Sequence, residues 1–384
     1  MSLSAITITC CAIVVAGLNK QSLNVRGAGL ALWYHYDSIS PTRTRHGSKE
    51  FWINCSDYSI VLEEPDYGKI KDGRDFSTLD DFYNLDSNDV RFVQVESEPV
   101  IENDTVLFGV YPQNVVHDQD LITHLNNEAV HYQDDNFLIE TWYKYKGEFY
   151  EKIIGNCFHE GYCAFDNGDL IVNDEVYWFK CEPIAWKILK TEDNIYTLLS
   201  PTLLDMCQYY YSYDARIYGG KTIYANNYSH SLINGYLNGE FLDAITFLGA
   251  CSPAGTIVDN SKETTDSPEQ NPFAFDNHLT QVFLLSYQDY LNPTYGFETT
   301  DSYSSSRYCK TTEYVRVKGA SYNCYDDWLM NNGAYWTRSP AYSGKDLSGI
   351  YASCVDDEGI MFYASVKSTD FAFQPALRLE ISLN

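Results

Sequence analysis

The sequence has few basic residues for its size. Its 384 residues include 26 lysines and arginines against 53 aspartates and glutamates, which gives a formal net charge of −27. Nucleic acids are bound through basic surfaces, and anionic lipids attract the same positive charge. The composition therefore argues against a nucleic-acid partner and disfavours docking on an anionic membrane.

The sequence also lacks a long apolar run. Residues 4–18 (SAITITCCAIVVAGL) are apolar over about 15 positions, which is short of the roughly 20 residues needed to cross a bilayer. This length fits the hydrophobic region of an export signal, although no lysine or arginine precedes it. A buried strand rich in Ile, Val and Thr fits equally well. Both interpretations stay open, and we expect no direct membrane insertion of the main domain.

Cysteines do not follow a metal-binding or disulfide pattern. There are eleven, an odd number, in a chain too long to need a disulfide scaffold. The closest approach to a zinc motif is Cys157 and Cys163 with His159 and Glu160 between them. A tetrahedral zinc site needs about four ligands, and no second cysteine pair follows at a suitable spacing. We expect buried free thiols and no zinc.

Catalytic motifs are missing as well. No histidine occurs beyond His278, and the chain contains no nucleophile elbow, phosphate loop or HExxH sequence. The acidic groups at 326–327 and 356–358 could ligate calcium, but they do not have the spacing of an EF-hand loop or of a lectin's calcium triplets. We therefore expect no catalytic residue, no metal and no cofactor.

Aromatic residues, in contrast, are abundant. The chain has 33 Tyr, 19 Phe and 7 Trp, and 45% of its residues are hydrophobic. Disordered chains are poor in such residues, so the protein is expected to fold. Its length supports two domains, or one large domain with an accessory region. Residues 1–103 contain short β-like runs and no motif, and we interpret them as a β-rich accessory region before a main domain at 104–384.

The main domain has the pattern of an α+β fold. A short strand at 105–111 is expected to stop at the turn residue Pro112. Apolar residues alternate at Ile184, Trp186 and Ile188, which predicts a half-buried strand, and a turn at 191–194 joins it to a partner strand as a hairpin.

One helix and several strands follow. Apolar residues at spacings of three and four predict a helix over 228–248, with Asn227, Ser229 or Ser231 as its N-cap and Gly249 at its end. A short buried strand is expected at 282–286. Four more, separated by turns, are expected to form a meander at 335–340, 350–355, 359–366 and 375–381.

The order of several short motifs resembles a known domain family. These motifs are residues 108–113 (FGVYPQ), 182–189 (EPIAWKIL), 198–200 (LLS), 236–241 (YLNGEF), 282–286 (VFLLS), 335–340 (YWTRSP) and 375–379 (PALRL). Together they look like a bacterial family of unknown function, frequent in Firmicutes and gut bacteria and often carried on cell-surface proteins. The resemblance covers residues 104–384. It implies a C-type-lectin-like or formylglycine-generating-enzyme-like fold.

Two features depart from that family. Gln374 stands where the family usually has an arginine before Pro-Ala-Leu. Formylglycine generation uses a pair of active-site cysteines in a characteristic context, which Cys309, Cys324 and Cys354 do not match. The resemblance therefore implies the fold more strongly than the oxidation of a peptidyl cysteine.

Two aromatic groups are candidate ligand-binding sites. Aromatic rings combine an apolar face with a polar tip, and arginine offers a planar fork of donors to carboxylates or phosphates. Trp336 could instead pack in the core with Arg338 paired internally, and tyrosine-rich loops also serve as packing. The first group is Tyr335, Trp336, Arg338, Tyr342 and Tyr351, near Asp356 and Asp357, and the second is Tyr209, Tyr210, Tyr211 and Tyr213.

The function expected from these residues is non-catalytic binding of an extracellular protein or glycan by a secreted or surface protein. A cytoplasmic location stays open. One alternative is an oxidoreductase of the formylglycine-generating type. Another is a structural or adhesive component of a surface or phage-like assembly, in which the N-terminal region forms a homo-oligomer.

Overall fold

The computed structural model describes residues 52–53, 60–61, 100–102, 105–131, 142–246, 252–325, 330–344 and 348–381. The chain divides into two compact units, and the second is formed by residues 99–131, 141–244 and 253–384. In the first unit, β1 (Trp52–Ile53) pairs antiparallel with β2 (Ile60–Val61). The apolar run at 4–18 and most of the expected accessory region lie outside the described residues.

In the second unit, a nine-stranded sheet is built around β8 (Val176–Glu192), its longest strand. On one side β8 pairs with β4 (Thr105–Val115); on the other, its first part pairs with β7 (Glu148–Ile154) and its last part with β9 (Ile195–Leu199). All pairs in this sheet are antiparallel. The outer strands are β3 (Val100–Glu102) beside β4, β6 (Trp142–Tyr145) and β5 (Val130–His131) beyond β7, and β22 (Pro375–Glu380) and β16 (Val282–Leu284) beyond β9.

The expected hairpin is β8 and β9. Ile184 and Trp186 are buried, as their alternation predicts, but a register shift after Ile188 turns Leu189 into the core instead. The expected stop at Pro112 is wrong, because β4 runs on to Val115 with a register shift beside this proline. Past its pairing with β3, this edge of β4 has no neighbouring strand among the described residues, and a residue without an N–H group is tolerated at such a position.

A second sheet has five strands in the order β11 (Asp205–Met206), β21 (Ala372–Phe373), β18 (Tyr335–Pro340), β19 (Tyr351–Val355) and β20 (Met361–Ser365). β18, β19 and β20 form an antiparallel meander, as expected, while β21 runs parallel to β18.

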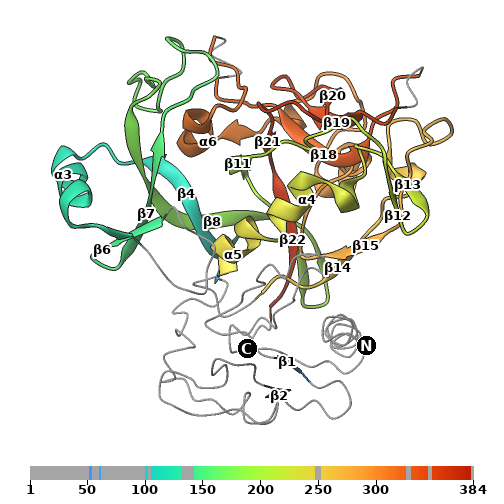
Figure 1. Cartoon of the computed structure of the whole chain (residues 1–384), viewed down its shortest axis with the longest axis horizontal. Helices are drawn as coiled ribbons and strands as arrows, with labels where there is room; N and C mark the ends of the chain where they lie inside the picture. Colours follow the sequence, from blue (N-terminus) through green and yellow to red (C-terminus); the bar gives the residue numbers. More distant parts are fainter. Residues whose placement is uncertain are drawn as a thin grey trace. The chain divides into compact units, whose positions relative to one another are not determined.

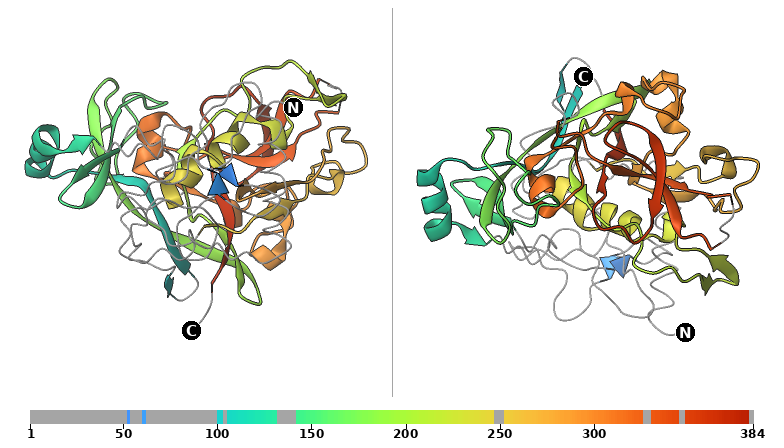
Figure 2. Two further views of the ribbon diagram at one scale, coloured as in Figure 1. Left: turned by 60° about the horizontal axis from the view of Figure 1, so that its bottom comes forward. Right: turned by 90° about the horizontal axis from the view of Figure 1, so that it is seen from above.

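The fourth strand of the expected meander belongs elsewhere. β22, the long red strand of Figures 1 and 2, runs away from the second sheet. It pairs with β9 and β16. At the crossover Gln374 donates to the carbonyl oxygen of Ser200 and accepts from the hydroxyl of Tyr290, which holds the chain at this change of sheet.

The expected long helix is divided into three pieces: η1 (Tyr228–His230), α4 (Leu232–Leu237) and α5 (Glu240–Thr246). Ser231 caps α4, since its side chain accepts from the N–H group of Asn234. The break has a cause at Asn238, whose side chain accepts from the N–H groups of Gln281 and Val282 and donates to the Val282 carbonyl. These bonds fix the Asn238 side chain to β16 and to the residue before it, and the helix is interrupted at this point. The expected end at Gly249 lies outside the described residues.

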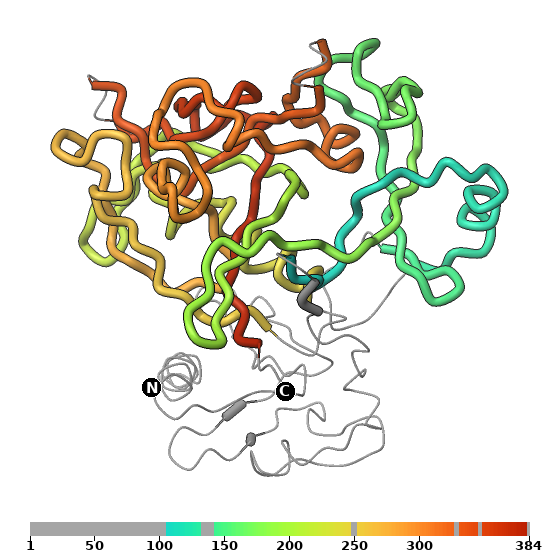
Figure 3. The backbone as a smooth tube through the Cα atoms, turned by 180° about the vertical axis from the view of Figure 1, so that it is seen from behind, coloured from blue at the N-terminus to red at the C-terminus, as the bar shows by residue number. Residues whose placement is uncertain are grey.

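Short elements and long loops complete the unit, as the tube in Figure 3 shows. The core joins both sheets, since buried residues of β9, β16, β22, β18 and β19 share one apolar cluster. No helix in the described part of the chain is long and apolar enough to cross a membrane. In the described residues, a nine-stranded and a five-stranded sheet, several two-stranded ones and few, short helices make this an α+β fold. The remaining elements are α3 (Gln119–Glu128), α6 (Glu313–Lys318), β10 (Thr202–Leu203), β12 (Arg216–Tyr218), β13 (Lys221–Ile223), β14 (Thr256–Val258), β15 (His278–Thr280), β17 (Lys310–Thr311), η2 (Lys262–Thr264), η3 (Asp289–Leu291), η4 (Pro293–Tyr295) and η5 (Ser305–Arg307).

Candidate functional site

The first group of predicted ligand residues lies mostly inside the protein. Tyr335 and Trp336 are fully buried in β18, and Arg338 is 6% exposed. The Tyr335 hydroxyl donates to the Arg307 carbonyl, and the Trp336 ring nitrogen donates to the Cys207 carbonyl. The expectation that these three side chains face a ligand is therefore corrected: β18 is a central strand, and both of its faces are covered.

Arg338 is paired internally. Its Nη1 donates to Asp289 Oδ2 at 2.7 Å and to the Leu284 carbonyl at 3.0 Å, and its Nε donates to the Asp259 carbonyl. Burial alone would raise the pKa of Asp289, but Arg338 and the N–H and hydroxyl groups of Ser286 outweigh it and lower that pKa. The guanidinium ties loops to the sheet and is not available to an external anion.

His278 lies in the same region in its neutral form. Burial, and then the charge of Arg338, lower its pKa from 6.5 to about 4. Asn260 Nδ2 lies 2.9 Å from its Nδ1, which suits an acceptor at that nitrogen. Burial, Arg338 and the Asn260 amide group therefore all disfavour the doubly protonated, charged imidazolium form of His278.

We expect this histidine to make the protein less stable as the pH is lowered. Between about pH 6.5 and pH 4 the unfolded imidazole binds a proton and the folded one does not, so the free energy of unfolding decreases as the pH is lowered through this range. A His278→Gln variant cannot take up that proton. Urea titrations of both proteins between pH 7 and pH 4 should therefore give a shallower pH dependence for the variant, and identical slopes would contradict the assignment.

The second group divides into buried and exposed residues. Tyr209 is fully buried and Tyr210 is 6% exposed, whereas Tyr211 is 62% and Tyr213 45% exposed. The Tyr209 ring contacts Trp336 edge-on, with centroids 5.4 Å apart, and its hydroxyl donates to the Arg338 carbonyl at 3.0 Å. The two predicted groups are therefore in contact through Tyr209 and Trp336, but this contact is buried in the core. For Tyr209 and Tyr210 the expected ligand contact is corrected to packing.

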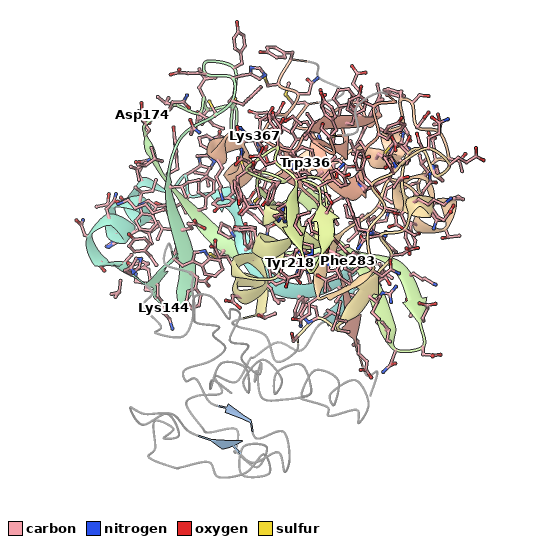
Figure 4. All side chains as sticks on the ribbon, turned by 45° about the vertical axis from the view of Figure 1, so that its right-hand side comes forward. Lys144, Asp174, Tyr218, Phe283, Trp336 and Lys367 are labelled. Atoms are coloured by element: carbon pink, nitrogen blue, oxygen red, sulfur yellow. The ribbon has the colours of Figure 1, made fainter. Side chains whose placement is uncertain are left out.

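The two predicted groups are also connected at the surface, through Ser365 of β20. The Tyr213 hydroxyl is 2.9 Å from Ser365 Oγ, and Ser365 is the cross-strand partner of Tyr351. Lys367 Nζ lies over the Tyr213 ring, 4.8 Å from its centroid. We call Tyr211, Tyr213, Tyr351 and Lys367 the tyrosine surface; Figure 4 labels Lys367 and the buried Trp336.

The loop that carries Tyr211 and Tyr213 is attached to the two residues that directly follow β20. The Tyr210 N–H group donates to the Val366 carbonyl at 2.8 Å, and Gln208 Nε2 donates to the Lys367 carbonyl at 2.7 Å. The Tyr351 ring contacts that of Tyr363, with centroids 5.4 Å apart. The rings of the tyrosine surface are thus held on a sheet and do not extend from a free loop.

The other predicted residues have local roles. The half-buried Tyr342 donates its hydroxyl to the Gly344 carbonyl. Asp356 Oδ1 accepts from the N–H groups of Glu358 and Ile360, so it closes the β19–β20 turn, and burial raises its pKa. Asp357 accepts from Asn323 Nδ2. The acidic pair 326–327 lies outside the described residues.

Sequence reasoning missed a buried polar cluster around Asp205. This carboxylate is fully buried; its Oδ2 accepts from the hydroxyls of Tyr111 and Tyr236, each at 2.6 Å, and its Oδ1 accepts from the Met206 N–H group and from Lys318 Nζ at 2.5 Å. Burial, followed by the charge of Asp205, raises the pKa of Tyr111 and of Tyr236. For Lys318, burial alone would lower the pKa, but Asp205 and Glu151 raise it.

We call Tyr111, Asp205, Tyr236 and Lys318 the Asp205 cluster. Its members come from β4, β11, α4 and α6, which are far apart in the sequence, and both carboxylate oxygens, both hydroxyls and the ammonium group have partners within the protein. This arrangement fits a structural junction better than a catalytic centre, because a reacting group would need a free acceptor or donor.

The thiols in the described residues are free: Cys157, Cys163, Cys181, Cys207, Cys309, Cys324 and Cys354. Burial raises the pKa of Cys309 and Cys354, and it raises the pKa of Cys207 to about 12. Nucleophilic and metal-ligating cysteines need the thiolate, which these environments disfavour. Among the described residues, no group of three or more His, Cys, Asp or Glu side chains could hold a metal ion.

Comparison with known proteins identifies one domain. Residues 193–381 match the family model described as a domain of unknown function (DUF6273). The expectation of a domain family of unknown function is confirmed over this span, which begins in the β8–β9 turn. No curated protein and no solved structure matches the chain.

Proposed function

We propose that this chain is a non-catalytic binding protein that holds a glycan on its tyrosine surface. A ligand of this kind is met outside the cell, so the proposal includes a secreted or surface-displayed location. The observation that carries it is that Tyr213 and the half-buried Tyr351 ring contact residues of β20, while the backbone beside Tyr211 is bonded to Val366, directly after that strand.

Fixed rings favour binding because little freedom is lost when the ligand arrives. Tyr213 is restrained by its hydroxyl contact with Ser365 and by Lys367, and the Tyr211 ring lies against that of Tyr210 with centroids 4.5 Å apart. Exposed rings that were free to move would lose more rotamer entropy on binding.

The tyrosine surface can contact a ligand through its aromatic ring faces more than through its hydroxyl groups. The Tyr213 hydroxyl contacts Ser365 and the Tyr211 hydroxyl accepts from Tyr210, so these polar tips are already engaged. Apolar ring faces suit the C–H faces of a sugar, while the ammonium group of Lys367 can donate to sugar oxygens. A glycan is therefore the ligand class that the surface fits best, ahead of an extracellular protein.

The fold proposal that accompanies this function is a C-type-lectin-like or formylglycine-generating-enzyme-like domain. Its support is the combination of short strands, short helices and long loops in the second unit. The oxidoreductase alternative has less support, because the raised pKa values of Cys309 and Cys354 disfavour reactive thiolates.

We expect the double variant Tyr211→Ala/Tyr213→Ala to bind its glycan at least about tenfold more weakly, since truncation of a tyrosine at the centre of an interface commonly costs about 2 kcal/mol. The measurement is a glycan array followed by titration calorimetry with the glycan that binds best. Tyr162→Ala is the matched control, because Tyr162 is as exposed as Tyr211, at 62%, but lies in the loop between β7 and β8.

Two results would contradict the proposal. One is an array on which no glycan binds while extracellular proteins do, which would make the ligand a protein. The other is equal affinity of the double variant and the Tyr162→Ala control, which would remove the tyrosine surface from binding.

A further inference from the structure

We propose that Cys157 and Cys163 are a redox pair, which a small disulfide such as oxidised glutathione converts into a disulfide bridge. Both cysteines lie in the segment between β7 and β8 (Figure 1). Cys157 is 5% exposed and Cys163 is fully buried. The inference concerns a different part of the chain from the tyrosine surface and does not rest on the proposed function.

The two cysteines are held on either side of the same residue, Ile171. The Ile171 N–H group donates to the Cys163 carbonyl at 2.8 Å, and the Cys157 sulfur lies 3.8 Å from the Ile171 carbonyl oxygen. Asn173 Oδ1 accepts from the Cys157 N–H group at 2.7 Å, which fixes the backbone at that end. The two thiols also share a hydrogen bond with each other. The sulfur atoms are therefore neighbours in the reduced protein.

The surroundings of the two sulfurs assign their order of reaction. Burial, followed by the hydrogen bond with Cys163, raises the pKa of Cys157 to about 12, so Cys157 keeps its proton in the reduced pair. The Cys163 sulfur faces a backbone donor, because it accepts from the His159 N–H group at 3.4 Å. The attacking form of a cysteine is the thiolate. We therefore assign the first attack to Cys163 and the closing of the bridge to Cys157.

The reaction consists of two thiol–disulfide exchanges. Cys163 loses its proton and attacks one sulfur of oxidised glutathione, so that the glutathione S–S bond breaks, a mixed disulfide forms and one glutathione leaves. Cys157 then loses its proton and attacks the Cys163 sulfur, which forms the bridge and releases the second glutathione. The cysteines give up two electrons and two protons, and these end on two molecules of reduced glutathione.

The turn between the cysteines gives an oxidant access to them. Residues 158–162 are exposed or half-buried, with Phe158 at 47% and Tyr162 at 62%. Exposed loops with few buried contacts open at a low cost in free energy. Oxidised glutathione can therefore reach the two sulfurs when this turn opens, while both sheets stay folded.

Cys324 is the alternative partner for Cys163. It is half-buried, and burial, followed by the charge of Cys163, raises its pKa. Its own hydrogen bond is to Tyr325, however, whereas the Cys157 thiol bonds to Cys163. The contacts therefore favour the bridge between Cys157 and Cys163.

The experiment equilibrates the full chain with about 1 mM reduced and about 1 mM oxidised glutathione at about pH 8. After an acid quench, free thiols are alkylated in denaturant, and the protein is cut with chymotrypsin for mass spectrometry. Because chymotrypsin cuts after Phe158 and Tyr162, the bridge would join two peptides into one species, about 2 Da lighter than the two peptides together. We expect at least about tenfold more of this species than of any bridged peptide from the buried Cys309 or Cys354.

Cys324→Ser is the matched control and should keep the bridge, whereas Cys157→Ser and Cys163→Ser should abolish it. Circular dichroism verifies that each variant folds, and the unsubstituted chain tests the proposal by itself. Full alkylation of Cys157 and Cys163, or a bridge from either one to another cysteine, would overturn the proposal. The glycan array of the proposed function uses tyrosine variants, so failure of either proposal is recognised separately.

Discussion

Replacing Asp205 by alanine is expected to lower the free energy of unfolding by about 3–5 kcal/mol, the range found when one partner of a buried ion pair is removed. The variant leaves Lys318 and the hydroxyls of Tyr111 and Tyr236 without their shared acceptor. Urea denaturation monitored by tryptophan fluorescence measures the loss.

A surface ion pair is the matched control for this result. Asp276 pairs with Lys221, but its side chain is 81% exposed, so Asp276→Ala should cost no more than about 1 kcal/mol. The combined variant Asp205→Asn/Lys318→Met should recover part of the stability lost in Asp205→Ala, because no unpaired buried charge remains. If Asp205→Ala and Asp276→Ala had equal effects, the Asp205 cluster would not be a structural junction.

The second large effect is expected for Trp336→Ala, at about 3–5 kcal/mol of unfolding free energy. The indole is fully buried, stacks on Phe371 with centroids 4.5 Å apart, and donates to the Cys207 carbonyl. Truncation leaves a large cavity and an unmet carbonyl. The measurement is again the urea midpoint, read by circular dichroism because a tryptophan is lost.

The contrast with Tyr211→Ala separates packing from recognition. Tyr211 is mostly exposed, so its replacement should change stability by no more than about 0.5 kcal/mol while it weakens ligand binding. Trp336→Ala, measured where it is still folded, should keep the ligand affinity. The reverse outcome, a stable Trp336→Ala variant that no longer binds, would return Trp336 to the ligand site.

Local sequence patterns predicted the elements that depend on neighbouring residues, such as a hairpin and a helix cap. The alternation around Trp186 predicted β8 and its hairpin, and the oxygen-bearing residues before Leu232 included the true cap, Ser231. The long helix was wrong because Asn238 bonds a strand more than forty residues away, an interaction that periodicity does not contain. For the same reason the sequence does not show that β22 changes sheets after Gln374.

The candidate site shows a similar limit. Composition revealed that tyrosines are numerous, but whether Tyr209 or Tyr211 is exposed depends on how the loop lies against β20. Asp205 had no signal of its own, because its partners at 111, 236 and 318 come from distant segments.

The origin of those partners affects how the protein can be dissected. The matched span, 193–381, starts inside a β-turn and excludes β8, which lies against β9, as well as Tyr111 on β4. In a fragment cut at that boundary, one edge of β9 would lose its partner β8, and Asp205 would lose the hydrogen bond from Tyr111. We therefore expect residues 193–381 alone to be less stable than the longer chain, and shortened versions of the protein should retain the chain from β4 onward.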